Sequence, residues 1–148
     1  MKFYALTLKA IYCEMVILFD GVCNLCNGFV KFIIKRDKKG IFKFAALQSA
    51  YGKGLIEHFK IAGNGLDTVL LYDGKQVFTR SDASIKILCL LGGIWSASLV
   101  FVALPRFMRN GIYNFIAKKR YKLFGKQENC MVPTDEIKSR FLNDTRFQ

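Results

Sequence analysis

The chain has 148 residues, of which 52% are hydrophobic, 14% aromatic and 23% charged, so one domain with an ordinary buried core can form. This composition excludes a disordered tail, a collagen-like fibre and a low-complexity linker, and no segment repeats at a fixed period. The 23 Lys and Arg residues outnumber 11 acidic ones, and the resulting formal net charge of +12 predicts a surface that attracts anions, phosphates or anionic lipid.

The cysteine count also bears on the compartment. Five cysteines are an odd number and too few for a disulfide-stapled secreted scaffold. The first residues, MKFYALTLKAIYCEM, show no signal-peptide pattern. We therefore expect a cytoplasmic protein, where paired cysteines are more often redox-active or metal-binding than structural.

A strand and a helix are predicted first. The apolar run at residues 16–19 ends at Asp20-Gly21, which is typical of a buried strand that enters a turn. A helical pattern begins at Asn24, has basic residues in its last turns, and is expected to end at Gly40.

In the middle of the chain the pattern predicts a strand at residues 41–47 and a helix at 51–61. A hairpin follows, with strands at 68–72 and 76–79. Asp73-Gly74 is a strong hairpin-turn signal. Ser81 precedes an apolar helical run and is predicted to cap it. The order β-α-β-α-β-β-α favours a mixed sheet with helices packed on it.

Residues 87–105 carry no charge and are nearly long enough to cross a bilayer. Because Gly92-Gly93 divides this run, we favour a buried helix hairpin over a membrane span. A basic helix follows over residues 106–126, with no acidic residue. Its expected packing face holds four apolar side chains, Phe107, Ile112, Phe115 and Ile116.

The sharpest chemical feature is the motif D-G-V-C-N-L-C, which contains Asp20, Cys23 and Cys26. Cysteines three apart on a first helical turn face the same side within disulfide reach. Unpaired N–H groups and the positive end of the helix dipole favour the thiolate of Cys23. We predict that Cys23 is an accessible nucleophile and Cys26 the resolving thiol, in an exchange that passes through a mixed disulfide.

Asp20 has two interpretations. Its carboxylate is placed to exchange a proton with the resolving cysteine, and it is equally suited to hydrogen-bond the backbone of the turn at Gly21-Val22. Both alternatives stay open from the sequence.

The other cysteines and the single histidine favour redox chemistry over a zinc site. Zinc needs about two more thiolate or imidazole ligands at suitable spacing, and no second C-x-x-C is present. We interpret Cys89 as a small buried residue, His58 as a surface residue, and Cys130 as either a packed residue or a third redox thiol. No metal or cofactor is expected.

The motif residues resemble the DCC family of thiol-disulfide oxidoreductases, which is named for the aspartate and the two cysteines that stand here as Asp20, Cys23 and Cys26. The similarity continues through later blocks, at residues 19–49, 68–88 and 112–125 and at Pro105, Cys130 and Pro133. The resemblance implies an α/β, thioredoxin-like fold, a mixed sheet with flanking helices and here a C-terminal helical extension. It also implies thiol-disulfide exchange with a disulfide-containing protein or a small thiol substrate and an external thiol reductant.

We divide the chain into an extension at residues 1–14, a domain at 15–133 and a tail at 134–148. The extension lies outside the family pattern. We expect either that translation begins at Met15 or that residues 1–14 are poorly ordered. Thioredoxins have a cis-proline before the third strand, but the corresponding place here is Asp67-Thr68. Their substrate-binding backbone therefore cannot be carried over.

Two rival functions rest on the basic segment. Its aromatic residues are able in principle to stack nucleic-acid bases, but we favour an arrangement that buries them and leaves the lysines in solvent. Attachment to a membrane surface through residues 87–105 and the neighbouring cations is a third class, which the sequence does not favour.

Overall fold

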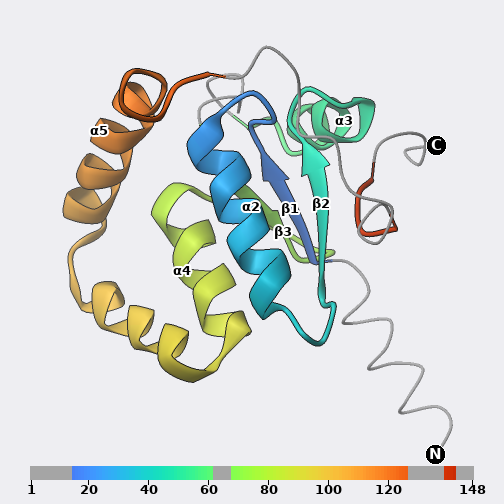
Figure 1. Cartoon of the computed structure of the whole chain (residues 1–148). Coiled ribbons are helices and arrows are strands. Elements are labelled where there is room, and N and C mark those ends of the chain that lie inside the picture. The colour runs from blue at the N-terminus through green and yellow to red at the C-terminus, as the bar shows by residue number, and fades with distance from the viewer. Residues whose placement is uncertain (1–14, 62–67, 127–138, 143–148) are drawn as a thin grey trace, which may run out of the picture.

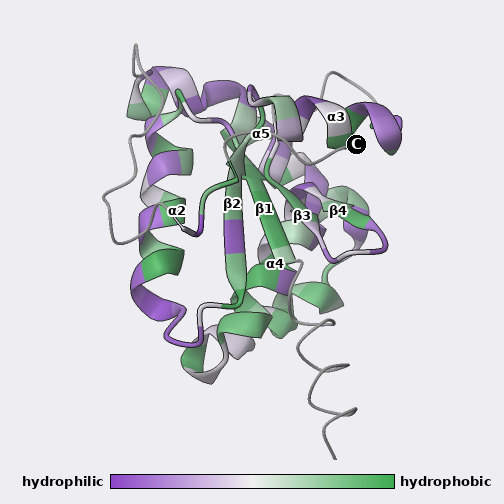
Figure 2. Ribbon diagram, turned by 90° about the vertical axis from the view of Figure 1, so that its right-hand side faces the viewer, coloured by the Kyte–Doolittle hydropathy of each residue, from purple (hydrophilic) through white to green (hydrophobic). Residues whose placement is uncertain are grey.

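A computed structural model describes residues 15–61, 68–126 and 139–142. Its sheet has the strand order β2-β1-β3-β4 (Figures 1 and 2). Strand β1 (Met15–Phe19) runs parallel to β2 (Phe42–Ala46) and antiparallel to β3 (Leu70–Tyr72), which pairs with β4 (Val77–Thr79). The central strand is thus the one that leads into the cysteine motif.

Helices cover both faces of this sheet. Helices α2 (Asn24–Arg36) and α4 (Arg80–Leu91) lie on one face, and α3 (Ala50–His58) lies on the other (Figure 1). The 3-10 helix η1 (Gly93–Ala103) and helix α5 (Arg106–Phe124) follow. The mixed α/β architecture and the predicted element order are confirmed, including the C-terminal helical extension.

The core has two layers because neighbouring residues of β1 point to opposite faces of the sheet. Ile17 and Phe19 join the cluster under α2 and α4. Val16 and Leu18 join the cluster under α3. Figure 2 shows β1 hydrophobic along its length, as expected for a strand buried on both sides.

Two predicted helix boundaries are wrong. Helix α2 stops before Gly40 because the Asp37 carboxylate accepts hydrogen bonds from the backbone N–H groups of Ile41 (3.1 Å) and Phe42 (3.0 Å). Ser81 does not cap α4, which begins at Arg80. Its hydroxyl instead donates to Oδ1 of Asn110 on α5 at 2.7 Å.

The buried helix hairpin at residues 87–105 is also wrong. Helix α4 ends at Leu91, and the chain turns through Gly92 and Gly93 with φ of 72° and 61°, angles that glycine adopts without strain. The following η1 leaves most of its apolar side chains in solvent. Within the described residues, no helix is long and apolar enough to cross a membrane.

Helix α5 turns a different face to the protein from the one we expected. Phe107, Ile112, Phe115 and Ile116 are exposed, and the buried or half-buried side includes Arg120. Apolar residues occur all round this helix, so its spacing alone does not select the packed face. The expectation that its aromatic residues are buried fails for the phenylalanines, while Tyr113 and Tyr121 are half-buried.

Part of the expected C-terminal tail packs on the sheet. The backbone N–H of Phe44 donates to the carbonyl of Arg140, and that of Leu142 donates to the carbonyl of Phe44, both at 2.8 Å. Phe141 joins the core cluster, and the Arg140 guanidinium pairs with the buried Asp37 carboxylate. The expected extension at 1–14 lies outside the described residues, as do Cys130 and Asp67.

Candidate active site

The two motif cysteines lie at the start of α2, as predicted. Cys23 is the N-cap residue and Cys26 belongs to the first helical turn. Both are free thiols, and they approach each other to 3.5 Å. The turn before them is held by the buried Asn27, whose side-chain amide donates to the carbonyl of Gly21 at 3.0 Å.

The expected accessibility of the leading sulfur is wrong for this conformation. Cys23 is 0% exposed and Cys26 is 5% exposed. The end of α5 lies beside the start of α2: a backbone bridge pairs Cys23 with Lys126, and the Asn24 side chain donates to the carbonyl of Phe124 at 2.8 Å. Both cysteines of the motif are therefore covered by the rest of the protein.

Cys26 holds its proton firmly. Burial, as the largest cause, together with negative charge on Cys23 and the hydrogen bond to Cys23, raises the pKa of Cys26 from 9.0 to about 12. The Arg120 guanidinium and a backbone hydrogen bond from Asp20 act in the opposite direction. At neutral pH the Cys26 thiol is thus a hydrogen-bond donor to its partner.

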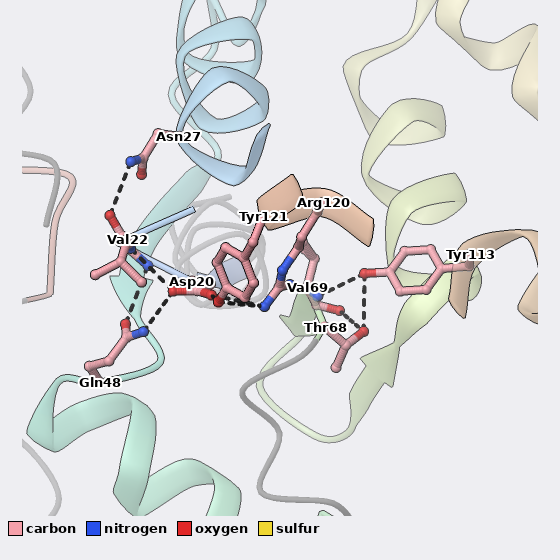
Figure 3. A network of polar contacts seen from close by, with 10 residues as sticks. Asp20, Val22, Asn27, Gln48, Thr68, Val69, Tyr113, Arg120 and Tyr121 are labelled. Atoms are coloured by element: carbon pink, nitrogen blue, oxygen red, sulfur yellow. Dashed lines mark hydrogen bonds and ion pairs between the residues drawn. The ribbon is translucent and has the colours of Figure 1, made fainter. Parts of the chain in front are cut away.

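Asp20 lies at the centre of a buried polar network (Figure 3). Its Oδ1 accepts hydrogen bonds from the backbone N–H of Val22 (3.1 Å) and the side-chain amide of Gln48 (2.7 Å). Its Oδ2 accepts from the guanidinium of Arg120 (2.8 Å) and from the Tyr121 hydroxyl. The bond to Val22 is the turn contact expected in one of the two interpretations of Asp20.

The network shifts its members' proton affinities. Burial disfavours the charged form of Arg120, but the hydrogen bond from Arg120 to Tyr121 and the charges of Cys26 and Asp20 outweigh it and raise the pKa of Arg120. Burial and the bond to Asp20 raise the pKa of Tyr121 to about 12. At neutral pH, a buried cation therefore stands close to the cysteine pair.

A pocket of about 220 Å³ lies between α2, α4 and α5, and Cys26 and Arg120 line it. Its other walls are mostly apolar, formed by Leu25, Phe29, Val69, Ser84, Tyr113, Ile116 and Ala117. Apolar cavities of about 150 Å³ can take a benzene-sized ligand. An apolar group of that size thus fits in a pocket that Cys26 helps to line.

The position before β3 is held by a side chain rather than by a proline. The Val69 backbone N–H donates to the Tyr113 hydroxyl at 2.9 Å, and the Thr68 hydroxyl lies 3.1 Å from the same oxygen (Figure 3). Among the described residues no peptide bond is cis. Tyr113 thus ties this loop to α5 and occupies the backbone donor of Val69.

The remaining candidates lie apart from the pair. Cys89 is half-buried rather than buried, and its sulfur lies 3.5 Å from the Ser98 hydroxyl. His58 is exposed, as expected. The described residues contain no group of three or more His, Cys, Asp or Glu side chains that could hold a metal ion.

Sequence reasoning missed four residues of the site, Gln48, Tyr113, Arg120 and Tyr121. Arg120 and Tyr121 belong to the basic segment, where three of their four neighbours at 118–123 are also basic, and the sequence predicts no individual partner for either. They lie about one hundred residues from Asp20 in the chain. Local spacing carries no signal for such a contact.

Comparison with known proteins identifies the family of the chain. The family model of DCC1-like thiol-disulfide oxidoreductases matches residues 17–126, from β1 through α5. The chain belongs to this family. No solved structure matches the chain.

Two curated relatives extend the match. An uncharacterized Bacillus subtilis protein, YuxK, is 47% identical over 127 residues, which cover 86% of this chain and 93% of YuxK. A DCC family protein of Arabidopsis thaliana, described as chloroplastic, is 35% identical over 116 residues, which cover 78% of this chain and 67% of that protein.

Proposed function

We propose that the protein is a thiol-disulfide oxidoreductase in which Cys23 attacks the substrate and Cys26 resolves the intermediate. The observation that carries this proposal is the pair of free thiols 3.5 Å apart at the N-terminus of α2. Cys23 is the N-cap residue of α2, and burial keeps the proton on Cys26. The proposed division of roles follows from these two positions in the helix.

The exchange proceeds in two steps. The Cys23 thiolate attacks one sulfur of a substrate disulfide, and the other sulfur leaves as a thiolate that takes up a proton. Cys26 then loses its proton and attacks Cys23, which forms the Cys23–Cys26 disulfide and releases the second substrate thiol. The substrate gains two electrons and two protons in total, and an external thiol reductant returns the pair to its dithiol state.

Substrate entry requires the cover over Cys23 to open. Lys126 pairs with Cys23 through the backbone just beyond the end of α5, and the proposal places the opening at this contact. Access alone favours Cys26, because this residue lines the pocket. Position at the N-cap of α2 favours Cys23, and the two assignments predict opposite behaviour of the serine variants.

Asp20 acts in this proposal as a positioning residue. Its carboxylate accepts hydrogen bonds from Val22, Gln48, Arg120 and Tyr121. This set holds Arg120 near the cysteine pair, where the guanidinium lowers the pKa of Cys26 against the effect of burial. Arg120 would thereby help Cys26 to ionise when it attacks Cys23.

The substrate is proposed to be a disulfide-containing protein or a small thiol compound in its oxidised form. A reducing compartment such as the cytoplasm suits the reaction, because glutathione and thioredoxin keep exposed dithiols reduced there.

The test uses the full chain, dithiothreitol as the reductant and a model disulfide as the substrate. Cys23→Ser should abolish turnover, and reduced Cys26→Ser, mixed with the disulfide after dithiothreitol is removed, should accumulate a mixed disulfide that mass spectrometry locates on Cys23. Cys89→Ser is the matched control and should retain turnover. A mixed disulfide on Cys26 in the Cys23→Ser variant would reverse the roles, and full turnover in both motif variants would refute the proposal.

A further inference from the structure

The exposed large apolar side chains of the described residues are concentrated in η1 and α5. Ile94 is 80% exposed and Phe107 is 76% exposed. The others are Leu99, Val100, Phe101, Val102, Met108, Ile112, Phe115, Ile116, Leu123 and Phe124. Figure 1 shows η1 and α5 following each other along the side of the molecule away from β2 and α3. We call the exposed residues of these two helices the η1–α5 surface.

This surface is held in place by packing beneath it. The Trp95 ring meets the Phe32 ring of α2 edge to face, with centroids 4.8 Å apart, and the Arg36 guanidinium lies 5.0 Å from the Trp95 ring. Ser98 is buried against Cys89. The exposed apolar side chains of η1 therefore stand on an anchored helix, and soluble proteins rarely expose so many together without a partner.

The same surface is strongly basic. Residues 83–126 contain no Asp or Glu. Lys118, Lys119 and Lys122 are exposed on α5, and the ammonium of Lys119 lies 4.6 Å from the centre of the Phe115 ring. Cations thus stand among the exposed apolar side chains rather than on a separate face.

We propose that the η1–α5 surface docks on a bilayer that contains anionic lipid. Its apolar side chains would enter the boundary between headgroups and acyl chains, and its lysines would contact the anionic headgroups. Long lysine side chains suit this boundary because their apolar stems lie along hydrocarbon while the ammonium groups remain in water. Docking leaves the helices parallel to the membrane, and it is independent of the proposed redox activity.

Other binding partners match either the charge or the apolar side chains of the η1–α5 surface, but not both. A second copy placed face to face would bring lysine against lysine, with no acidic residue from 83–126 to neutralise them. Nucleic acid would match the charge and stack on phenylalanine, but aliphatic residues such as Ile94, Val100 and Leu123 have no stacking face. Anionic lipid matches both the charge and the aliphatic side chains.

The test is co-sedimentation of the full chain with vesicles of phosphatidylcholine alone or mixed with phosphatidylglycerol. We expect binding to the mixed vesicles at least about tenfold tighter than to the neutral ones, because each cation near an anionic surface adds to the attraction. High salt should weaken the binding, since it screens these charges. Equal binding to both vesicles, or none, would overturn the proposal.

Two surface variants separate the contributions of charge and of apolar burial to vesicle binding. Lys118→Glu/Lys119→Glu/Lys122→Glu should lose the preference for anionic vesicles, and Val100→Asp/Phe107→Asp should lose binding about tenfold or more through lost apolar burial. All five positions are exposed, so the fold should persist, which circular dichroism checks.

The matched control reverses three exposed lysines elsewhere and changes the net charge equally, as Lys39→Glu/Lys53→Glu/Lys75→Glu. Its binding should remain within about twofold of the unmodified chain, because headgroup attraction acts near the docked face. If this control lost vesicle binding as much as the surface variant does, net charge alone would explain the effect, and the proposed docking surface would be refuted. A dimer without lipid that Val100→Asp/Phe107→Asp dissociates, or tighter binding to single-stranded DNA than to mixed vesicles, would also contradict a lipid partner.

A tryptophan placed at the surface reports contact directly. Trp95 is the only tryptophan in the chain, so Trp95→Phe/Val100→Trp carries one probe at an exposed position of η1. Its emission should shift to shorter wavelength on anionic vesicles, and lipids brominated near the headgroup should quench it. An unshifted, unquenched probe on bound protein would refute contact through η1.

Discussion

Asp20 and Arg120 form an ion pair at 2.8 Å although one hundred residues separate them, and their side chains are only 2% and 3% exposed. The pair joins the turn before the cysteines to the last part of α5. It thus fixes the helix that also lines the pocket and ends beside Cys23.

Arg120→Leu should destabilise the fold by about 3–5 kcal/mol, because it leaves the Asp20 carboxylate buried without its cation. Asp20→Asn/Arg120→Leu should cost less than the sum of the two single variants, with a coupling of about 0.5–3 kcal/mol. Urea unfolding measures all of them. Arg106→Leu is the control on the same helix: its side chain is 77% exposed beside Asp82, so its loss should stay below about 1 kcal/mol. A coupling near zero would show that the buried pair does not connect the two elements.

The pKa of Cys26 predicts how stability depends on pH. The folded state raises this pKa from 9.0 to about 12, so it holds the proton more tightly than the unfolded chain does. The resulting stability is fully present below pH 9.0 and is lost as the pH rises toward 12. The difference in unfolding free energy between the unmodified chain and Cys26→Ser should therefore change across this range.

Alkylation gives a second measurement of the same group. Cys26 should react slowly with iodoacetamide at pH 9.0, and its rate should rise at higher pH as the thiolate forms. Cys23→Ser removes the charge of the partner, so the pKa of Cys26 should fall but remain above 9.0, since burial is the larger cause. Reaction at pH 9.0 as fast as in the urea-unfolded chain would contradict the prediction.

Gly125 controls the contact between α5 and the start of α2. Its φ is 80°, and a Cβ there would lie 3.1 Å from the Asn24 side-chain nitrogen. Gly125→Ala should destabilise the fold by roughly 1–3 kcal/mol and make Cys23 react faster with alkylating agents, because Lys126 beside it is displaced. Gly111→Ala is the control within α5, where a Cβ meets nothing within 4 Å. It should stabilise by about 0.5–1 kcal/mol without changing Cys23.

The pocket predicts a preference among substrates if the proposed activity holds. Ala117→Phe should fill part of the space beside Cys26 and lower kcat/KM for dipyridyl disulfide about tenfold. The kcat/KM for hydroxyethyl disulfide should change less than about twofold, because this small, polar compound does not depend on apolar contact with the pocket. An equal fall for both substrates would mean that the pocket does not receive the substrate.

Local patterns predicted the elements that lie close together in the chain. The apolar run before Asp20, the turn at Asp73-Gly74 and the placement of Cys23 at a helix start all follow from short-range rules of strand burial, hairpin geometry and helix termini. These features positioned the cysteine pair correctly before any three-dimensional information.

Contacts between distant segments were not predictable in this way. Arg120 belongs to a run of basic residues, and only the folded chain brings it to Asp20. The spacing of Phe107 and Phe115 resembled a core face, but the buried side of α5 is selected by its partners Asp20, Thr68 and Val69. The backbone bridge between Cys23 and Lys126 likewise joins two segments that are far apart in the chain.

The three residues from Arg140 to Leu142 shield a sheet margin that would otherwise be open. They bond to both backbone groups of Phe44 on the outermost strand β2, while the opposite margin, β4, is only three residues long. Unpaired strand margins are templates for intermolecular pairing and aggregation. Shortened versions of this protein that end before residue 139 would therefore expose the edge of β2 and be prone to aggregate. An expression tag should be added after the C-terminal residues and should not replace them.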